Sequence, residues 1–161
     1  ATGVDTVLRL VRESELDIFG PAFPTYASNN RVFLGGEGMI ATADGYCDFL
    51  RIFLNKGMLN GKDFLKVKSI SEITSPQTQL DSKWGYNGYN LWVTGDTLRK
   101  RGWGDEGLWQ GGGYEGTQFW IDPKRGFVGV LMTQSNSLQK EAHEFYNDFR
   151  GELYKQIFEN E

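Results

Sequence analysis

The chain has 161 residues, of which 24% are charged and 39% hydrophobic, as in a single folded globular domain and unlike a disordered segment. Its net charge of −4 and its scattered lysines and arginines give no basic face, so no nucleic-acid partner is expected. No apolar run approaches the roughly 20 residues that a membrane-spanning helix needs, so no transmembrane segment is predicted.

The first third of the chain begins with an apolar, β-branched run that predicts a strand over Thr6 to Val11. A loop is predicted over Asp17 to Arg31, where prolines and paired asparagines interrupt any regular pattern. After a glycine-rich turn at residues 35–38, Thr42 can cap a helix. Gly57 is the predicted end of that helix, whose apolar face comprises Tyr46, Phe49, Leu50, Phe53 and Leu54.

The middle of the chain changes from helix to strand signals. A short helix is predicted over Ser69 to Thr74, ended by Pro76, and a strand over Tyr89 to Val93. Residues 94–96 then predict a turn. The aromatic residues of this region could bind sugar or acyl groups, but packing is the favoured interpretation for each, with Trp109 the best exception: Trp84, Tyr86, Tyr89, Trp92, Trp103, Trp109 and Trp120.

A run of glycines followed by a hairpin is the most informative segment. Gly111 to Gly113 carry no Cβ atoms, so main-chain N–H groups there could approach a substrate or an oxyanion closely, although a flexible surface loop is the alternative. Thr117 to Ile121 predict a strand, and residues 122–126 predict a turn. Phe127 to Met132 form an apolar run typical of a strand covered on both faces.

Two segments carry a family resemblance: Gly35 to Leu65 and Gln110 to Gln134. Together they resemble the serine β-lactamase and penicillin-binding-protein family, in its class C, esterase and D-aminopeptidase branch, over roughly residues 30–160. The resemblance implies an α+β fold, an α/β sandwich in which helices flank an antiparallel sheet. It also implies a single, incomplete domain over 1–161, with a helical part at 35–76 and the sheet plus C-terminal helix at 84–161.

The departures from the family pattern matter as well. Family enzymes acylate a serine in an S-x-x-K motif, assisted by a second motif, and close the site with K-T-G or a relative. Only the third element is found here, so the chain is interpreted as the C-terminal half of a longer hydrolase whose missing N-terminal half carries the serine. One S-x-x-K string, Ser137 to Lys140, begins a predicted helix, and a helix N-cap is the favoured interpretation of Ser137. The apolar positions of this helix recur at three- and four-residue steps: Leu138, Ala142, Phe145, Phe149, Leu153 and Ile157.

The same resemblance assigns candidate site residues. Gln110 stands where relatives carry Lys or His, and Gly112 stands at the glycine of K-T-G. Gly113 falls where the family strand gives a catalytic backbone N–H to the oxyanion hole. Tyr114 could face the cleft or belong to a solvated turn. The predicted substrate-binding residues are Trp109, Gln110, Gly111, Gly112 and Tyr114.

Metal and cofactor chemistry find little support in the sequence. The single cysteine, Cys47, is interpreted as a structural thiol, and His143 has no second histidine or thiol with which to build a zinc site. His143 is therefore expected on a helix surface rather than in a catalytic triad. No metal and no cofactor are predicted.

The expected function is that of the C-terminal part of a serine hydrolase, acting through an acyl-enzyme on a β-lactam, a D-amino-acid peptide or a small ester. The full-length protein is expected to be an enzyme and this chain alone to be inactive. A non-catalytic peptide- or glycan-binding member of the fold and an independent interaction domain remain alternatives. The resemblance favours a periplasmic or secreted location, which the sequence itself does not set.

Overall fold

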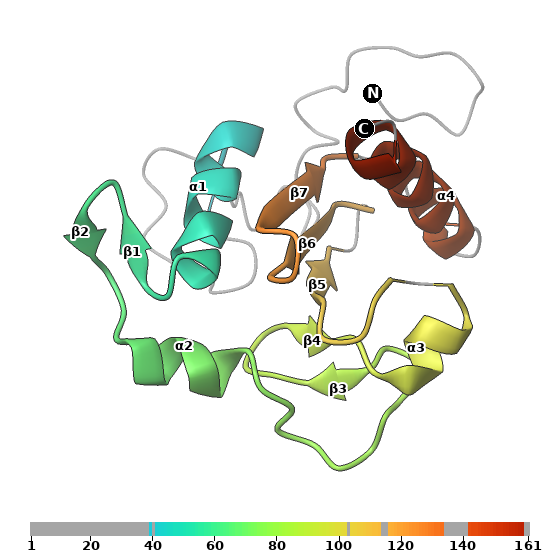
Figure 1. Ribbon diagram of the computed structural model, residues 1–161, viewed down its shortest axis with the longest axis horizontal. Helices are drawn as coiled ribbons and strands as arrows, with labels where there is room; N and C mark the ends of the chain where they lie inside the picture. Colours follow the sequence, from blue (N-terminus) through green and yellow to red (C-terminus); the bar gives the residue numbers. More distant parts are fainter. Residues whose placement is uncertain (1–38, 40, 103, 114–115, 134–141, 160–161) are drawn as a thin grey trace, which may run out of the picture. The chain divides into compact units, whose positions relative to one another are not determined.

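The structure is a computed structural model, and it describes residues 39, 41–102, 104–113, 116–133 and 142–159. The chain divides into two compact units, 1–42 and 43–161. Every helix and strand described below belongs to the second unit (Figure 1). The strand predicted over Thr6 to Val11, the loop predicted over Asp17 to Arg31 and the glycine turn at 35–38 lie outside the described residues. No helix in the described ranges is long and apolar enough to cross a bilayer.

A five-stranded antiparallel sheet forms the centre of the second unit. Its strands follow one another in chain order: β3 (Tyr86–Asn87), β4 (Trp92–Val93), β5 (Trp109–Gly112), β6 (Gln118–Asp122) and β7 (Phe127–Leu131). The β6–β7 hairpin confirms the strand-turn-strand prediction. The carboxylate of Asp122 accepts the N–H groups of Lys124 and Arg125, each at 3.0 Å, and Gly126 takes a positive φ of 66°.

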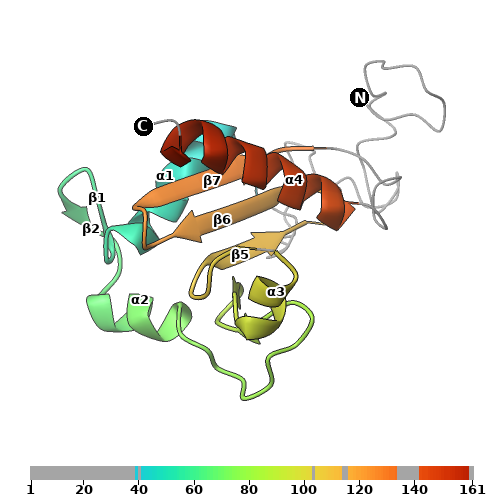
Figure 2. The same ribbon diagram turned by 45° about the vertical axis from the view of Figure 1, so that its right-hand side comes forward.

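Helices cover both faces of this sheet (Figure 2). Helix α1 (Ala43–Leu54) packs on β7 and β6, and the ring centroids of Tyr46 and Phe119 are 5.7 Å apart. Helix α4 (Ala142–Tyr154) lies on the other face, where Tyr154 meets Phe127 at 5.8 Å. A π-helical turn, η2 (Lys155–Glu159), extends α4. The predicted α+β arrangement, with helices flanking an antiparallel sheet, is confirmed.

The core lies between these layers. Leu50 of α1 and Ile121 of β6 are almost fully buried. On the α4 side, Trp120 is 4% exposed and lies over Gly129 of β7, where a Cβ atom would be 2.2 Å from the indole ring. A glycine is therefore required in the middle of β7, because the indole occupies the space of a side chain.

The end of α1 leads into a small hairpin. Lys56 and Gly57 take positive φ angles, and the Gly57 N–H bonds to the Ile52 carbonyl at 2.7 Å, so the predicted stop at Gly57 is confirmed. Strands β1 (Met58–Leu59) and β2 (Lys62–Asp63) follow and pair with each other. Helix α2 (Val67–Ile73) agrees with the predicted short helix before Pro76.

The structure differs from the predictions at two places in residues 89–100. The strand predicted over Tyr89 to Val93 is confined to its last two residues, because Asn90 has φ +59 and interrupts the extended backbone. After the predicted turn, the chain forms helix α3 (Asp96–Lys100), an element that the sequence pattern did not predict. The Asp81 carboxylate accepts the Thr97 N–H at 2.7 Å, a long-range contact that local sequence does not reveal.

The repeating apolar residues of α4 do not form its buried face. Phe145 and Phe149 are 45% and 39% exposed, whereas Tyr146 is 8% exposed. The Tyr146 hydroxyl donates a hydrogen bond to the Gly116 carbonyl. Arg150, one turn further on, reaches β5. The polar and aromatic row at four-residue steps therefore faces the sheet.

Candidate functional site

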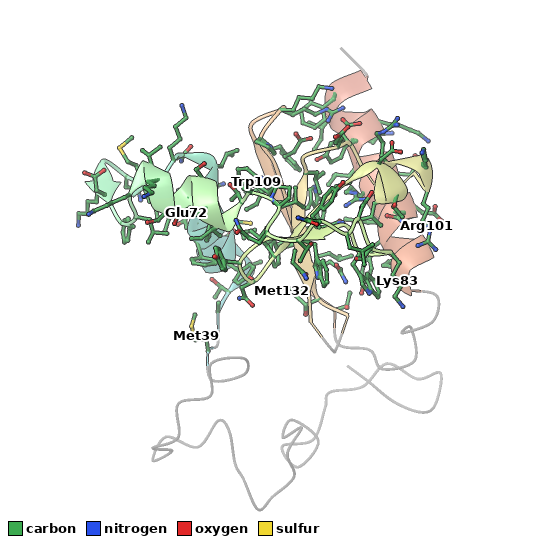
Figure 3. The ribbon with its side chains drawn as sticks, turned by 90° about the horizontal axis from the view of Figure 1, so that it is seen from below. Met39, Glu72, Lys83, Arg101, Trp109 and Met132 are labelled. Carbon is green, nitrogen blue, oxygen red and sulfur yellow. The ribbon has the colours of Figure 1, made fainter. Side chains whose placement is uncertain are left out.

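Four of the predicted site residues lie side by side on β5, in the middle of the sheet. Gln110 pairs with Trp92 of β4 on one side and with Trp120 of β6 on the other. Trp109, labelled in Figure 3, is half-buried. Gly113 directly follows the strand, and Tyr114 lies outside the described residues.

The sheet's own side chains fill the space beside two of the glycines. A Cβ atom at Gly111 would lie 2.5 Å from Phe119 Cε1, and one at Gly112 would lie 2.4 Å from Gln118 Nε2. Internal packing therefore gives one reason for the missing side chains at these positions. The predicted role of Gly111 and Gly112 in binding substrate is untested and stays a prediction.

The N–H of Gly113, predicted to serve an oxyanion, has a partner inside the chain. It donates to the Thr117 carbonyl at 2.8 Å, and the Gly113 carbonyl accepts the Gly116 N–H at 3.1 Å. Both groups therefore point into the turn that joins β5 to β6. The Gly113 N–H could meet an oxyanion only if this turn opened, and its catalytic role stays a prediction.

The backbone of Gly112 points the other way. In a strand, successive residues direct their N–H and C=O groups to opposite edges. The Leu108 carbonyl accepts the Thr94 N–H at 2.8 Å, so the even-numbered residues of β5 face β4. The β4 pairing ends with Trp92 opposite Gln110, and Asn90 turns the chain at that point. Gly112 is exposed, and within the described part of the chain no strand pairs with its N–H and C=O on this side, the open edge of β5.

A cationic group lies beside Gln110 on the α4 face of β5. Arg150 Nη1 donates to the Gln110 side-chain carbonyl at 3.1 Å, and Nη2 donates to Asn147 Oδ1 at 3.2 Å. Burial lowers the pKa of Arg150, while the charges of Tyr154 and Asp122 act in the opposite direction. A guanidinium nevertheless stays charged at neutral pH, so a positive charge is held close to an uncharged residue of the strand.

The cluster of Gln110, Asn147 and Arg150 can form further hydrogen bonds. Both acceptors of Arg150 are neutral amide oxygens, and no carboxylate within the described ranges forms an ion pair with it. The Nδ2 donor of Asn147 is buried without a hydrogen-bond partner among the described residues. A half-buried cation next to a spare donor can bind an anionic oxygen through charge-assisted hydrogen bonds.

A second charged cluster lies further along α4. The buried Asp122 carboxylate accepts Tyr154 Oη at 3.0 Å and Arg125 Nη1 at 2.8 Å. Burial alone would raise the pKa of Asp122, but the hydrogen bonds from Arg125 and Tyr154 outweigh it, so the pKa is lowered. Burial and then the Asp122 charge raise the pKa of Tyr154. Arg125 also binds Asp105 at 2.7 Å, so this cluster joins three segments.

Arg150 and Asn147 were not among the predicted site residues. The signal available was their position: Tyr146, Arg150 and Tyr154 recur at four-residue steps, and an arginine between two tyrosines on one helix row indicates a buried polar contact. The apolar spacing of Phe145 and Phe149 instead predicted the other face of the helix as the one that packs on the sheet.

The remaining candidates add little to the site. Cys47 is half-buried, and burial raises the pKa of its thiol, as expected for a structural cysteine. Ser137 lies outside the described residues, as does the side chain of His143, so their predicted roles stay predictions. Within the described ranges, no group of three His, Cys, Asp or Glu side chains could hold a metal ion.

Comparison with known proteins identifies the family. The model of the Beta-lactamase family matches residues 5–151, which is most of the chain and includes β5, the β6–β7 hairpin and Arg150. No curated protein matches the sequence. Because the family match extends over far more than half of the residues, and the antiparallel sheet lies between helices as expected, the chain belongs to the Beta-lactamase family.

Proposed function

We propose that this protein contributes the substrate-lining part of a serine hydrolase that acts through an acyl-enzyme on an amide or an ester. The observation that carries the proposal is the open edge of β5 at Gly112, next to the Gln110 and Arg150 pair. An extended substrate can align its own amide with an open strand edge and form main-chain hydrogen bonds there. The family match supports the reaction class.

The charge beside the strand points to the substrate class. Gln110 carries no charge, but the Arg150 guanidinium, 3.1 Å away, does. A substrate with a carboxylate near its scissile bond would gain a charge-assisted contact at this position. β-Lactams and peptides that end in a D-amino acid both have such a carboxylate, and a simple neutral ester lacks it. The proposed substrates are therefore acidic amides or esters.

The nucleophile belongs to another part of the protein in this proposal. The S-x-x-K string at Ser137 to Lys140 follows the β6–β7 hairpin, whereas the family pattern sets the serine before the glycine strand. The 161-residue chain should therefore bind substrate weakly and form no acyl-enzyme by itself.

Intact-mass spectrometry tests this assignment. The 161-residue chain is treated with a fluorophosphonate probe and with a penicillin, alone and together with the upstream segment of the protein. Labelling of the upstream serine only, when both parts are present, is expected. An adduct on Ser137 or on any other serine of this chain would refute the proposed location of the nucleophile.

Substitution of Arg150 tests the substrate class. In the complete protein, Arg150→Gln should raise KM for a carboxylate-bearing substrate by roughly tenfold, the value of one charge-assisted hydrogen bond, and leave KM for a neutral ester unchanged. Arg99→Gln is the matched control, because Arg99 is an exposed arginine that pairs with Asp96 at the surface. Equal effects on the acidic and the neutral substrate would refute recognition of the carboxylate by Arg150.

A second candidate function is a non-catalytic ligand-binding member of the family. Two observations favour it: the uncharged Gln110 and the internal hydrogen bond of the Gly113 N–H. Saturable binding of penicillin to the complete protein, without any covalent adduct, would support this candidate over the hydrolase.

A further inference from the structure

The chain contains two Asn-Gly pairs, and their surroundings differ. Asn60 and Gly61 form the two-residue turn between β1 and β2, with φ angles of 51° and 75°. Asn87 and Gly88 lie at the end of β3, inside the network of the sheet. We propose that Asn60 is a site of spontaneous deamidation in the folded protein and that the fold protects Asn87.

The reaction needs only the chain and water. The backbone nitrogen of Gly61 loses its proton to a base and attacks Cγ of the Asn60 side chain. A C–N bond forms, and the side-chain amide leaves as ammonia, which gives a five-membered succinimide. Water then opens the ring at either carbonyl and yields aspartate or isoaspartate. No oxidant or enzyme is needed.

The surroundings of Asn60 permit this attack. Both turn residues are exposed, and no backbone group in the described part of the chain accepts the Gly61 N–H. Among the described residues, no heavy atom beyond its chain neighbours lies within 4 Å of a Cβ built on Gly61. The left-handed turn must open before the nitrogen can reach Cγ. A hairpin with two residues in each strand opens at low cost.

The surroundings of Asn87 oppose the same attack. The Gly88 N–H donates to the Leu91 carbonyl at 2.9 Å, so the attacking nitrogen is already engaged. The Asn87 carbonyl accepts the Gln77 N–H at 2.6 Å, and its N–H bonds to Thr78 Oγ1 at 3.1 Å. The space at Gly88 is also filled, since a Cβ there would lie 2.5 Å from the Ile73 carbonyl oxygen.

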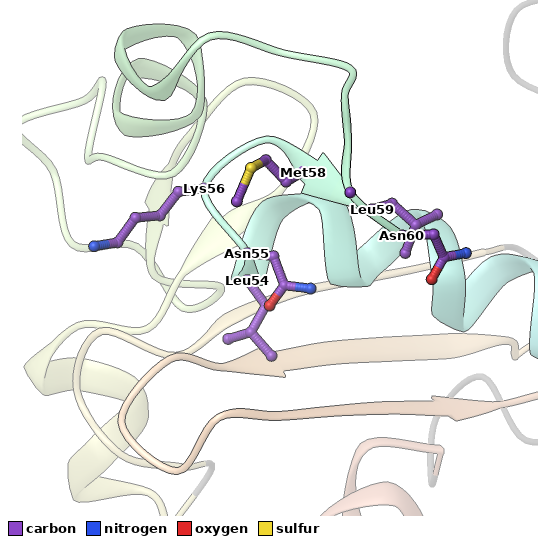
Figure 4. Close-up of a pocket in the computed structure, with 7 residues that line it drawn as sticks. Leu54, Asn55, Lys56, Met58, Leu59 and Asn60 are labelled. Atoms are coloured by element: carbon purple, nitrogen blue, oxygen red, sulfur yellow. The ribbon is translucent and has the colours of Figure 1, made fainter.

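Deamidation would change a defined part of the surface. Asn60 belongs to a shallow pocket that also includes Asn55, Lys56 and Met58, and its amide lies away from Lys56 and Met58 (Figure 4). Aspartate would add a negative charge at the tip of the hairpin. Isoaspartate would also add a methylene to the backbone, which the two-residue turn and the pairing of Leu59 with Lys62 cannot accommodate.

Peptide mapping of the aged protein tests the proposal. The complete chain is incubated in mildly alkaline buffer, folded and in urea that unfolds it, and aspartate plus isoaspartate at positions 60 and 87 are measured over time. In urea the two sites should react at similar rates. In the folded chain Asn87 should react at least about tenfold more slowly than Asn60, because three hydrogen bonds must break first.

Two variants separate the sites further. Asn60→Ser should remove the acidic species that isoelectric focusing detects in the aged folded protein, whereas Asn87→Ser should leave it. Similar rates at both sites in the folded chain would overturn the proposal. So would an Asn60 that stays intact in the folded chain while it reacts in urea.

Discussion

Gly129→Ala provides a direct test of the packing between β7 and the face of the sheet under α4. The new Cβ would lie 2.2 Å from Cζ2 and 2.3 Å from Cε2 of Trp120, far inside van der Waals contact. Trp120 is 4% exposed and pairs with Gly129 across the strands, so its ring cannot swing into solvent. Overpacking of this kind costs about 1 to 3 kcal/mol, and the free energy of unfolding should fall by an amount in or above this range.

Gly151→Ala is the matched control, because Gly151 is an exposed position of α4 where the same methyl group would meet no described residue within 4 Å beyond its own helix backbone and its chain neighbours. Alanine should stabilise this helix position by about 0.5 to 1 kcal/mol, an effect of opposite sign. Urea unfolding followed by far-UV circular dichroism measures both. Trp120→Phe removes the crowded ring atoms and should reduce the cost of Gly129→Ala. A neutral Gly129→Ala, or a cost unchanged by Trp120→Phe, would refute the packing argument.

Three further predictions concern stability and are measured by urea unfolding. Hydrogen bonds to Asp122 lower its pKa, so its carboxylate stabilises the fold above about pH 4 and this stability is lost as the pH falls; Asp122→Asn should flatten the acid limb of the stability curve. The pKa of Tyr154 is raised, so the stability that its protonated hydroxyl contributes is lost as the pH rises past about 10. Tyr154→Phe should therefore flatten the alkaline limb of the stability curve. An unchanged slope in either variant would contradict the corresponding statement. Gly57→Ala should destabilise the chain by more than about 1 kcal/mol, because its Cβ would meet the Leu65 carbonyl oxygen at 1.9 Å. Gly61→Ala, at an open turn position, should cost clearly less stability. Equal losses of stability in the two variants would argue against a close approach at Gly57.

Local patterns predicted the parts of the fold that depend on neighbouring residues. The β6–β7 hairpin follows from an apolar run, a turn with Asp122 and Gly126, and a second apolar run. Helix α1 follows from its spacing and from the stop at Gly57. Helix α3 could not be predicted in this way, because a carboxylate sixteen residues earlier, Asp81, satisfies its first turn.

The candidate site could be predicted only as far as its strand. The glycine run indicated Gln110 to Gly113, which share β5 and its end. The partner of Gln110 is forty residues away on another element, and neither periodicity nor spacing joins Gln110 to Arg150. The apolar residues of α4 also indicated a different helix face from the one that packs on the sheet. Tertiary packing, rather than the local pattern, decided that orientation.

The backbone groups of Gly112 and Gly113 on β5 and its end face in different directions. Gly113 directs its N–H into the β5–β6 turn, where Thr117 accepts it, whereas Gly112 directs its N–H and C=O to the open edge. A ligand that aligns with this edge would therefore meet the backbone of Gly112 first. Gln110, two residues earlier, places its amide on the same face as Arg150. In the proposed function, an extended, acidic ligand would bind both this edge and the guanidinium, whereas a strand edge alone offers only backbone hydrogen bonds.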